Sequence, residues 1–140
     1  MGDTQPLKSR VCDAVDRHRD PIVSLGEAIM DDPELGFKEV HTAKRVKEVF
    51  DELGLPYEDG LALTGVKGVL CGGRPGPTIA LMGELDALIV PDHERANPAT
   101  GAAHACGHNA QIAGLMGAAR GLVDSGVAPE LAGNILFFAV

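Results

Sequence analysis

The sequence has 140 residues, the length of one domain or of part of a larger one. Hydrophobic residues make up 45% of it and charged residues 23%, a composition typical of globular proteins. The formal net charge is -8 and no basic patch is present. This argues against nucleic acid or an anionic membrane as a partner, because both attract clusters of Lys and Arg.

Targeting signals are not visible in the sequence. No apolar run approaches the roughly 18 residues of a membrane span, and the first twenty residues lack the apolar stretch of a secretory signal. The three cysteines, Cys12, Cys71 and Cys106, are odd in number and widely spaced, so they do not indicate a disulfide framework. We therefore expect a reducing, cytoplasmic location. Cys12 and Cys71 are predicted to be small buried apolar side chains.

The first third of the chain has the apolar spacing of helices. Residues 7–30 follow an i, i+3/i+4 pattern, and Asp20 with Pro21 either opens a second helix there or kinks a single long one. Residues 32–37 are predicted to form a loop. A further helix is predicted from about Thr42 to Leu53, with Gly54 at its C-cap.

The later part of the chain alternates apolar strands with one more helix. Short β-branched segments at 66–71 and 78–82 predict two strands joined by a Gly/Pro-rich connection. A polar loop is predicted over 89–103, a third helix from about residue 109 or 110 to near 126, and a buried strand over 135–140. Helices alternating with apolar strands indicate an α/β layer fold.

The residues with chemical potential are concentrated in two segments. Acidic residues in the segment 83–86 follow the strand 78–82, where open α/β sheets place their ligand crevice. His104, Cys106 and His108 alternate, and alternate residues of an extended segment point to the same side. Amides at the start of the following helix would help to hold a thiolate at Cys106. Two carboxylates, two histidines and a thiol favour a metal site over a structural His/Cys turn.

Other interpretations of these residues are weaker. A zinc finger would need a second ligand pair at finger spacing, which the sequence lacks. The Gly-rich segment 71–76 lacks the Gly-Lys-Ser/Thr ending of a phosphate loop and precedes a strand. A nucleophilic Cys106 with a histidine base is chemically feasible, yet a thiol flanked by two histidines near acids is better suited to binding a cation. A non-catalytic truncated product or interaction module is a further alternative.

Several ordered motifs resemble one enzyme family. Residues 32–39, which read Asp-Pro-Glu-Leu-Gly-Phe-Lys-Glu, resemble the "PELGFxE" element of the amidohydrolase branch of the M20 metallopeptidase family. Further segments are similar to family elements in the same order: 64–66, 75–81, 86–88 and 104–108. The resemblance extends from about residue 33 to residue 140.

The resemblance implies a fold, an activity and a cofactor. It implies that residues 1–140 are the N-terminal portion of a zinc-exopeptidase-like catalytic domain, with a mixed sheet flanked by helices and without the family's lid and dimerisation domain. Members hydrolyse the amide bond of N-acyl amino acids, aminobenzoyl-glutamate or small dipeptides, using two divalent metal ions, zinc or manganese. A small-molecule substrate of this kind and a homodimer formed through the lid domain are the partners it implies.

The resemblance also assigns roles to particular residues. Cys106 and His108 match metal ligands, with the Cys106 thiolate bridging or lying next to the two ions. Asp86 matches the catalytic-site acid that orients the centre from behind the ligands. His104 belongs to the motif and is not expected to be a ligand.

Two positions depart from the commonest form of the motifs. Glu84 and Asn109 stand where many members have Asp. Together these departures resemble the subgroup that includes an aminobenzoyl-glutamate hydrolase subunit and dipeptidases, so they shift the expected substrate more than they affect metal binding.

The family pattern has further consequences for the chain alone. Its general-base glutamate, a second glutamate and two histidine ligands follow the segment equivalent to 134–140, so the 140-residue chain is expected to be inactive by itself. In the family further strands lie beside 135–140. The resemblance therefore predicts an exposed apolar sheet edge at that strand, and such an edge tends to pair or aggregate.

Overall fold

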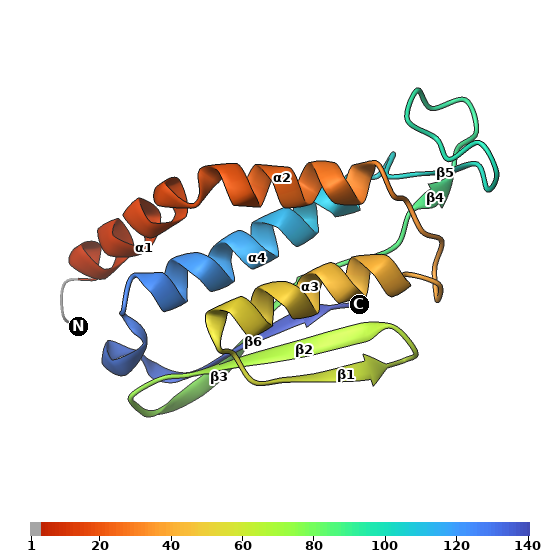
Figure 1. The fold of residues 1–140 in the computed structure, drawn as a ribbon. Helices are drawn as coiled ribbons and strands as arrows, with labels where there is room; N and C mark the ends of the chain where they lie inside the picture. The colour runs from red at the N-terminus through yellow and green to blue at the C-terminus, as the bar shows by residue number, and fades with distance from the viewer. Residues whose placement is uncertain (1–3) are drawn as a thin grey trace.

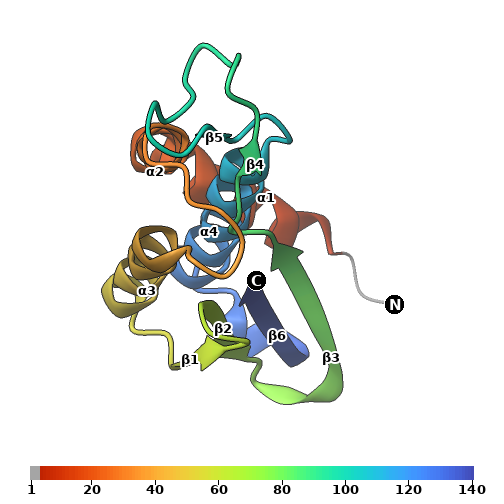
Figure 2. The same ribbon diagram turned by 90° about the vertical axis from the view of Figure 1, so that its right-hand side faces the viewer.

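The computed structural model describes residues 4–140. Within these residues, four α-helices lie on one face of a four-stranded sheet (Figures 1 and 2). In chain order the elements are α1 (Gln5–Arg17), α2 (Arg19–Met30), α3 (Val40–Leu53), β1 (Tyr57–Leu61), β2 (Gly65–Cys71), β3 (Arg74–Gly83), β4 (Leu88–Ile89), β5 (Ala102–Ala103), α4 (His108–Asp124), the 3-10 helix η1 (Ala128–Glu130) and β6 (Ala132–Ala139). The predicted α/β class with a mixed sheet is confirmed.

The main sheet has the strand order β1-β2-β6-β3. β2 runs antiparallel to both β1 and β6, whereas β3 runs parallel to β6. The parallel pair is joined through α4, which crosses back over the sheet as parallel connections require. Because β6 is paired on both sides, the prediction that the strand at 135–140 forms the exposed edge is wrong. Among the described residues the edge beside β6 is β3, with Ile79, Leu81 and Met82 exposed.

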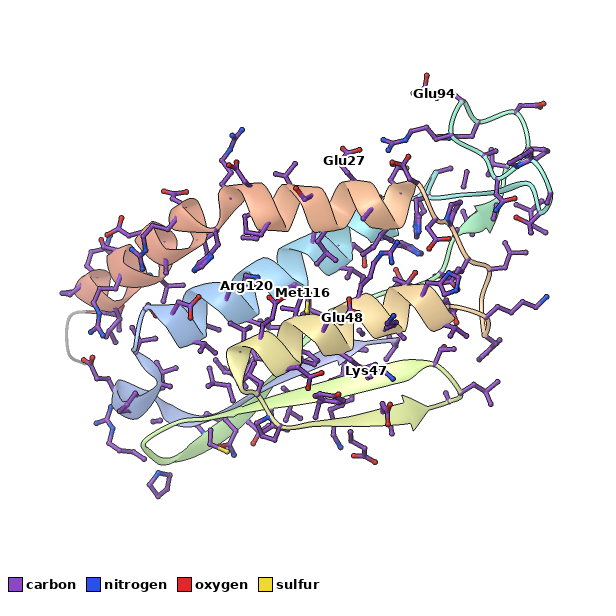
Figure 3. The ribbon with its side chains drawn as sticks, in the orientation of Figure 1. Glu27, Lys47, Glu48, Glu94, Met116 and Arg120 are labelled. Atoms are coloured by element: carbon purple, nitrogen blue, oxygen red, sulfur yellow. The ribbon has the colours of Figure 1, made fainter. Side chains whose placement is uncertain are left out.

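The helices form two layers over the sheet. α3 contacts β2 and α4 contacts β3, while α1 and α2 pack on the outer side of α4. Met116 and Arg120 lie where α4 faces α3 (Figure 3): Met116 is fully buried, and Arg120 forms an ion pair with Glu52 of α3. The largest fully buried side chains are Phe50, Phe137, Ile29, Leu85, Ile112, Met116, Val46, Val66 and Val127.

Pro21 explains the break between the first two helices. A proline at position 21 has no N–H to donate to the carbonyl of Arg17, four residues earlier, and its ring would clash with that carbonyl. α1 ends at Arg17, His18 lies between the helices, and the amide of Ile22 donates to the His18 carbonyl at 3.1 Å. The predicted alternative of two helices is therefore the correct one, with the break two residues before Asp20.

Most of the other predicted elements are confirmed. The helix expected over residues 42–53 is α3, which ends at Gly54 in the left-handed conformation, with a φ of 64°. β1 was not predicted because its Glu-Asp-Gly centre lacks apolar alternation, and it is stabilised by pairing with β2. The two short strands β4 and β5 lie at the ends of the predicted loop over 89–103. No helix described over residues 4–140 combines the length and the apolar character needed to cross a membrane.

The prediction that Cys12 and Cys71 are buried is wrong, because both are exposed. Cys71 is the last residue of β2, where the even-numbered residues Val66, Gly68 and Leu70 face the core, so its side chain points to the opposite face. Cys12 lies on α1, a helix in which Ala14 alone is fully buried.

Candidate metal centre

The candidate site lies where two parallel strands end and α4 begins. β3 ends at Gly83, and the next residues run beside the end of β6: the amide of Leu85 donates to the Val140 carbonyl at 2.7 Å. The following backbone is tied to the α2–α3 loop, since the Ala87 amide donates to the Glu34 carbonyl at 2.7 Å. This is the predicted crevice at the carboxyl ends of parallel strands, and it lies at the end of the sheet where β4 leaves the domain (Figure 1).

His108 has close polar contacts on both of its ring nitrogens. It is buried, and its Nδ1 atom lies 2.8 Å from Oδ1 of Asp86 and 2.9 Å from the Asp86 carbonyl oxygen. Its other ring nitrogen, Nε2, lies 2.9 Å from Oε2 of Glu84. A carboxylate on one ring nitrogen fixes the orientation of an imidazole whose other nitrogen binds a metal. The structure thus brings together the predicted residues Asp86 and His108, with Glu84 as a third member.

Gln111 is a site residue that the sequence did not single out. Its Oε1 accepts a hydrogen bond from the Glu84 amide and its Nε2 donates to Oε2 of Glu84, both at 3.3 Å. Gln111 lies three residues after His108 in α4 and therefore on the same side of the helix. That spacing was the available signal, and Gln111 holds Glu84 against the start of the helix.

The segment that carries Cys106 is a turn, so the predicted extended alternation is wrong. The amide of Gly107 donates to the His104 carbonyl at 3.1 Å, and Gly107 adopts the left-handed conformation with a φ of 85° as the residue before α4. As a result, His104 and His108 are buried while Cys106 is exposed. The three side chains do not share one side of a strand, and α4 begins at His108, one or two residues earlier than predicted.

His104 is buried without a hydrogen-bond partner on either ring nitrogen. Burial lowers the pKa of His104, and the nearby His108 lowers it further, against opposing contributions from Asp86 and Glu34. Burial therefore favours the neutral form of the His104 imidazole. That His104 is not itself a ligand stays a prediction.

The donors present match the chemistry of a divalent metal only in part. A thiol, an imidazole with a carboxylate behind it and a second carboxylate are donors that zinc accepts, and the carboxylates also suit manganese. However, within residues 4–140 no group of three or more His, Cys, Asp or Glu side chains is arranged to hold a metal ion. The described residues therefore do not form a complete metal site by themselves.

Similar proteins identify the family. No family model matches the chain. Thermostable carboxypeptidase 2 of Saccharolobus solfataricus is 40% identical over 110 residues, which are 76% of this chain and 28% of that protein. IAA-amino acid hydrolase ILR1-like 5 of Arabidopsis thaliana is 37% identical over 120 residues, which are 84% of this chain and 27% of that protein.

A solved structure agrees with these relatives. The YxeP protein of Bacillus subtilis, a dinuclear metal binding peptidase from the M20 family, superimposes with a TM-score of 0.76 and 28% identity, over 89% of this chain and 35% of that one. The chain belongs to the M20 peptidase and amidohydrolase family. This M20 chain spans about 28% of the length of the first curated relatives that it matches. The resemblance of the motifs is thereby confirmed, while the roles of Asp86, Cys106 and His108 stay predictions.

Proposed function

We propose that this M20 chain supplies the N-terminal part of the catalytic domain of a metal-dependent hydrolase. Its substrate would be the amide bond of an N-acyl or aminoacyl amino acid, such as aminobenzoyl-glutamate or a dipeptide. The observation that carries the proposal is the Asp86–His108 pair at the end of β3, with Glu84 on the other ring nitrogen. Relatives named as carboxypeptidases and amino acid hydrolases support an amide of this kind.

The residues of the site would divide the work as follows. His108 and Cys106 would hold metal, and Asp86 would keep the His108 ring oriented by accepting the proton on Nδ1. Glu84 places negative charge beside Nε2, the nitrogen left for the metal. When bound, two divalent ions, zinc or manganese, would supply the Lewis acidity that amide hydrolysis needs. A catalytic metal needs about three protein ligands, so we propose that residues 4–140 do not turn over substrate alone.

A chimera tests this proposal directly. Residues 33–140 would replace the matching segment of the Bacillus subtilis YxeP protein, and release of free amino acid from N-acyl amino acids and dipeptides would be measured with zinc or manganese. We expect hydrolysis by the folded chimera, and a loss of at least about tenfold when Asp86→Asn is introduced. The matched control is Asp92→Asn, in the exposed loop after β4. A chimera that folds, by circular dichroism, yet releases no amino acid would contradict the proposal.

The two alternative functions predict different results. If Cys106 is a nucleophile, the isolated chain or the chimera should stay active after chelation of metal and lose activity on alkylation. If the chain is a non-catalytic interaction module, no substitution in the site should change the amount of amino acid that is released. We also propose a cytoplasmic location, which is supported by three exposed thiols with no disulfide among residues 4–140.

A further inference from the structure

Within residues 4–140, three residues other than glycine occupy the left-handed region of the backbone map. They are Phe37, with a φ of 64°, Ala62, with 46°, and Leu63, with 90°. Bulky side chains rarely adopt such angles, and the strain persists only where surrounding contacts impose it. Phe37 lies in the α2–α3 loop and the other two lie in the turn between β1 and β2, so two separate segments are strained at one place.

Glu39 holds these two segments together. Its side chain is buried, with Oε1 accepting a hydrogen bond from the Phe37 amide at 2.9 Å and Oε2 accepting one from the Thr64 hydroxyl at 2.7 Å. Each carboxylate oxygen is therefore engaged by a different segment. These two hydrogen bonds, here called the Glu39 clasp, fix the conformation of both segments. The side chains of Phe37 and Leu63 point outward, where they are 70% and 74% exposed.

Between the two segments lies a pocket of about 250 Å³. Its apolar walls come from Phe37, Leu61, Phe138 and Val140, and none of the described Lys and Arg residues lines it. Of the residues described over 4–140, Glu39 is the only ionisable one in the lining, and both of its oxygens are already bonded. The pocket therefore offers apolar surface rather than charge, and burying that surface with an apolar group would be favourable.

Val140, which lines the pocket, is bonded to the backbone segment that carries Glu84 of the candidate metal centre. The Val140 amide donates to the Gly83 carbonyl at 3.0 Å, and its carbonyl accepts from Leu85 at 2.7 Å. These two bonds lie on either side of Glu84, the residue that contacts His108. In Figure 1 the α2–α3 loop, the β1–β2 turn and the start of β4 all lie at the same end of the sheet.

We propose that this pocket receives the apolar acyl group of the amide substrate and so determines specificity. The inference rests on the proposed function and deepens it, because it names the part of the substrate that is recognised away from the metal. A phenyl-sized group fits a pocket of about 250 Å³, whereas an acetyl group leaves most of its walls uncovered. Phe37 and Leu61, which both line the pocket, act here as specificity-determining residues and not as catalytic ones.

Ligand binding to the metal-free chain tests the pocket separately from catalysis. The ¹⁵N-labelled 140-residue chain would be titrated with N-acetyl-L-alanine and with N-benzoyl-L-alanine in the presence of EDTA, and amide chemical shifts would be followed. We expect the benzoyl compound to bind at least about tenfold more tightly, with the largest shifts at Phe37, Leu61 and Val140, which line the pocket. Equal affinity, or shifts centred on the apolar groove beside Leu7 and Leu131, would overturn the proposal.

Variants sharpen the result. Phe37→Asn removes the ring and places a residue that tolerates the left-handed conformation, so the fold should persist while the benzoyl preference falls to the level of acetyl. Val23→Asn is the matched control, because Val23 is 53% exposed on α2 and does not line the pocket. A benzoyl preference retained by Phe37→Asn would overturn the assignment. If the chain prefers the benzoyl compound but the chimera is inactive, only the proposed hydrolase function is contradicted. If the chimera is active but the chain shows no preference, only the assignment of the pocket is contradicted.

Discussion

Nδ1 of His108 lies 2.8 Å from the Asp86 carboxylate, across 22 residues of sequence. The pair joins the end of β3 to the first residue of α4, so a strand and a helix that are separated by a long loop meet at one ring. Asp86 is only partly exposed and His108 is almost fully buried. The imidazole is thus held in a single orientation before any ligand binds.

Asp86→Asn is expected to weaken metal binding without unfolding the chain. Replacing a carboxylate behind a metal-binding histidine costs about 10- to 100-fold in affinity in proteins of this kind, because the amide is a poorer acceptor for the proton on Nδ1. Calorimetric titration with zinc would measure the change. Asp92→Asn should leave the affinity unaltered, and an equal loss in both variants would show that the effect is not specific to the His108 partner.

Zinc is expected to protect Cys106 from alkylation. Thiolate bound to a metal reacts slowly with iodoacetamide, whereas free exposed thiols react at rates set by their thiolate fraction. Cys12 and Cys71 are exposed as well and serve as internal references. Mass spectrometry of peptides would quantify each site with zinc and with chelator. Equal labelling of Cys106 in both conditions would refute its assignment as a ligand.

The stability of the metal-free chain is expected to fall on mild acidification because of His104. Burial lowers the pKa of His104 below its ordinary value of about 6.5, so the unfolded chain binds the proton more readily than the folded chain. The free energy of unfolding should therefore decrease as pH falls from above the ordinary pKa to below the folded one. Urea unfolding at several pH values would measure the slope, and His104→Gln should reduce it. An unchanged slope in that variant would assign the effect to other groups.

Glu39→Ala is expected to destabilise the chain by about 2–4 kcal/mol, because the Phe37 amide and the Thr64 hydroxyl both lose a charged acceptor. The strained turn at Ala62 and Leu63 would relax as well. Urea denaturation gives the free energy, with the exposed Glu94→Ala as control. If the two variants were equally stable, Glu39 could not be the clasp between the two loops.

The free edge of β3 is expected to make the isolated chain self-associate. Gly83 and Leu85 direct their backbone groups toward β6, since both bond to Val140. Because these directions alternate along a strand, the backbone N–H and C=O groups of Thr78, Ala80 and Met82 point away from β6, toward the free edge. This alternation applies from Thr78 onward, because the register of β3 against β6 is irregular between Arg74 and Thr78.

Sedimentation velocity at increasing concentration would reveal the association of this edge. Met82→Lys, on the exposed side of β3, should shift the chain toward monomer, whereas Val23→Lys on α2 should not. A wild-type chain that stays monomeric at all concentrations would show that the edge is protected by some other means.

The sequence was sufficient for elements defined by apolar period and for the family motifs. α3, α4 and β2 were found because their apolar spacing and end signals agree, as with Gly54 after α3. The sequence was insufficient where pairing between strands determines the structure. β1 has little strand character of its own and depends on β2. The central position of β6 depends on its pairing with β2 and β3, which are distant in sequence.

The candidate site shows the same division. Asp86 and His108 were singled out from spacing, and the structure places them in contact. Gln111 was missed because its spacing from His108 indicates only that the two side chains share one side of the helix, and its contact with Glu84 arises from the tertiary fold. The alternation of His104, Cys106 and His108 was misjudged because one left-handed glycine converts an extended segment into a turn.

That glycine has a consequence for how the site can vary. A Cβ at Gly107 would meet no atom within 4 Å, so the position is restricted by its φ of 85° and not by space. Asn, which reaches the left-handed region more easily than other side chains, is the tolerable replacement, whereas a β-branched residue would force the peptide planes to rotate. The Cys106 thiol and the His108 imidazole would then move apart, because Gly107 alone separates them. In a library randomised at position 107 and selected for zinc binding, almost all surviving variants should carry Gly or Asn.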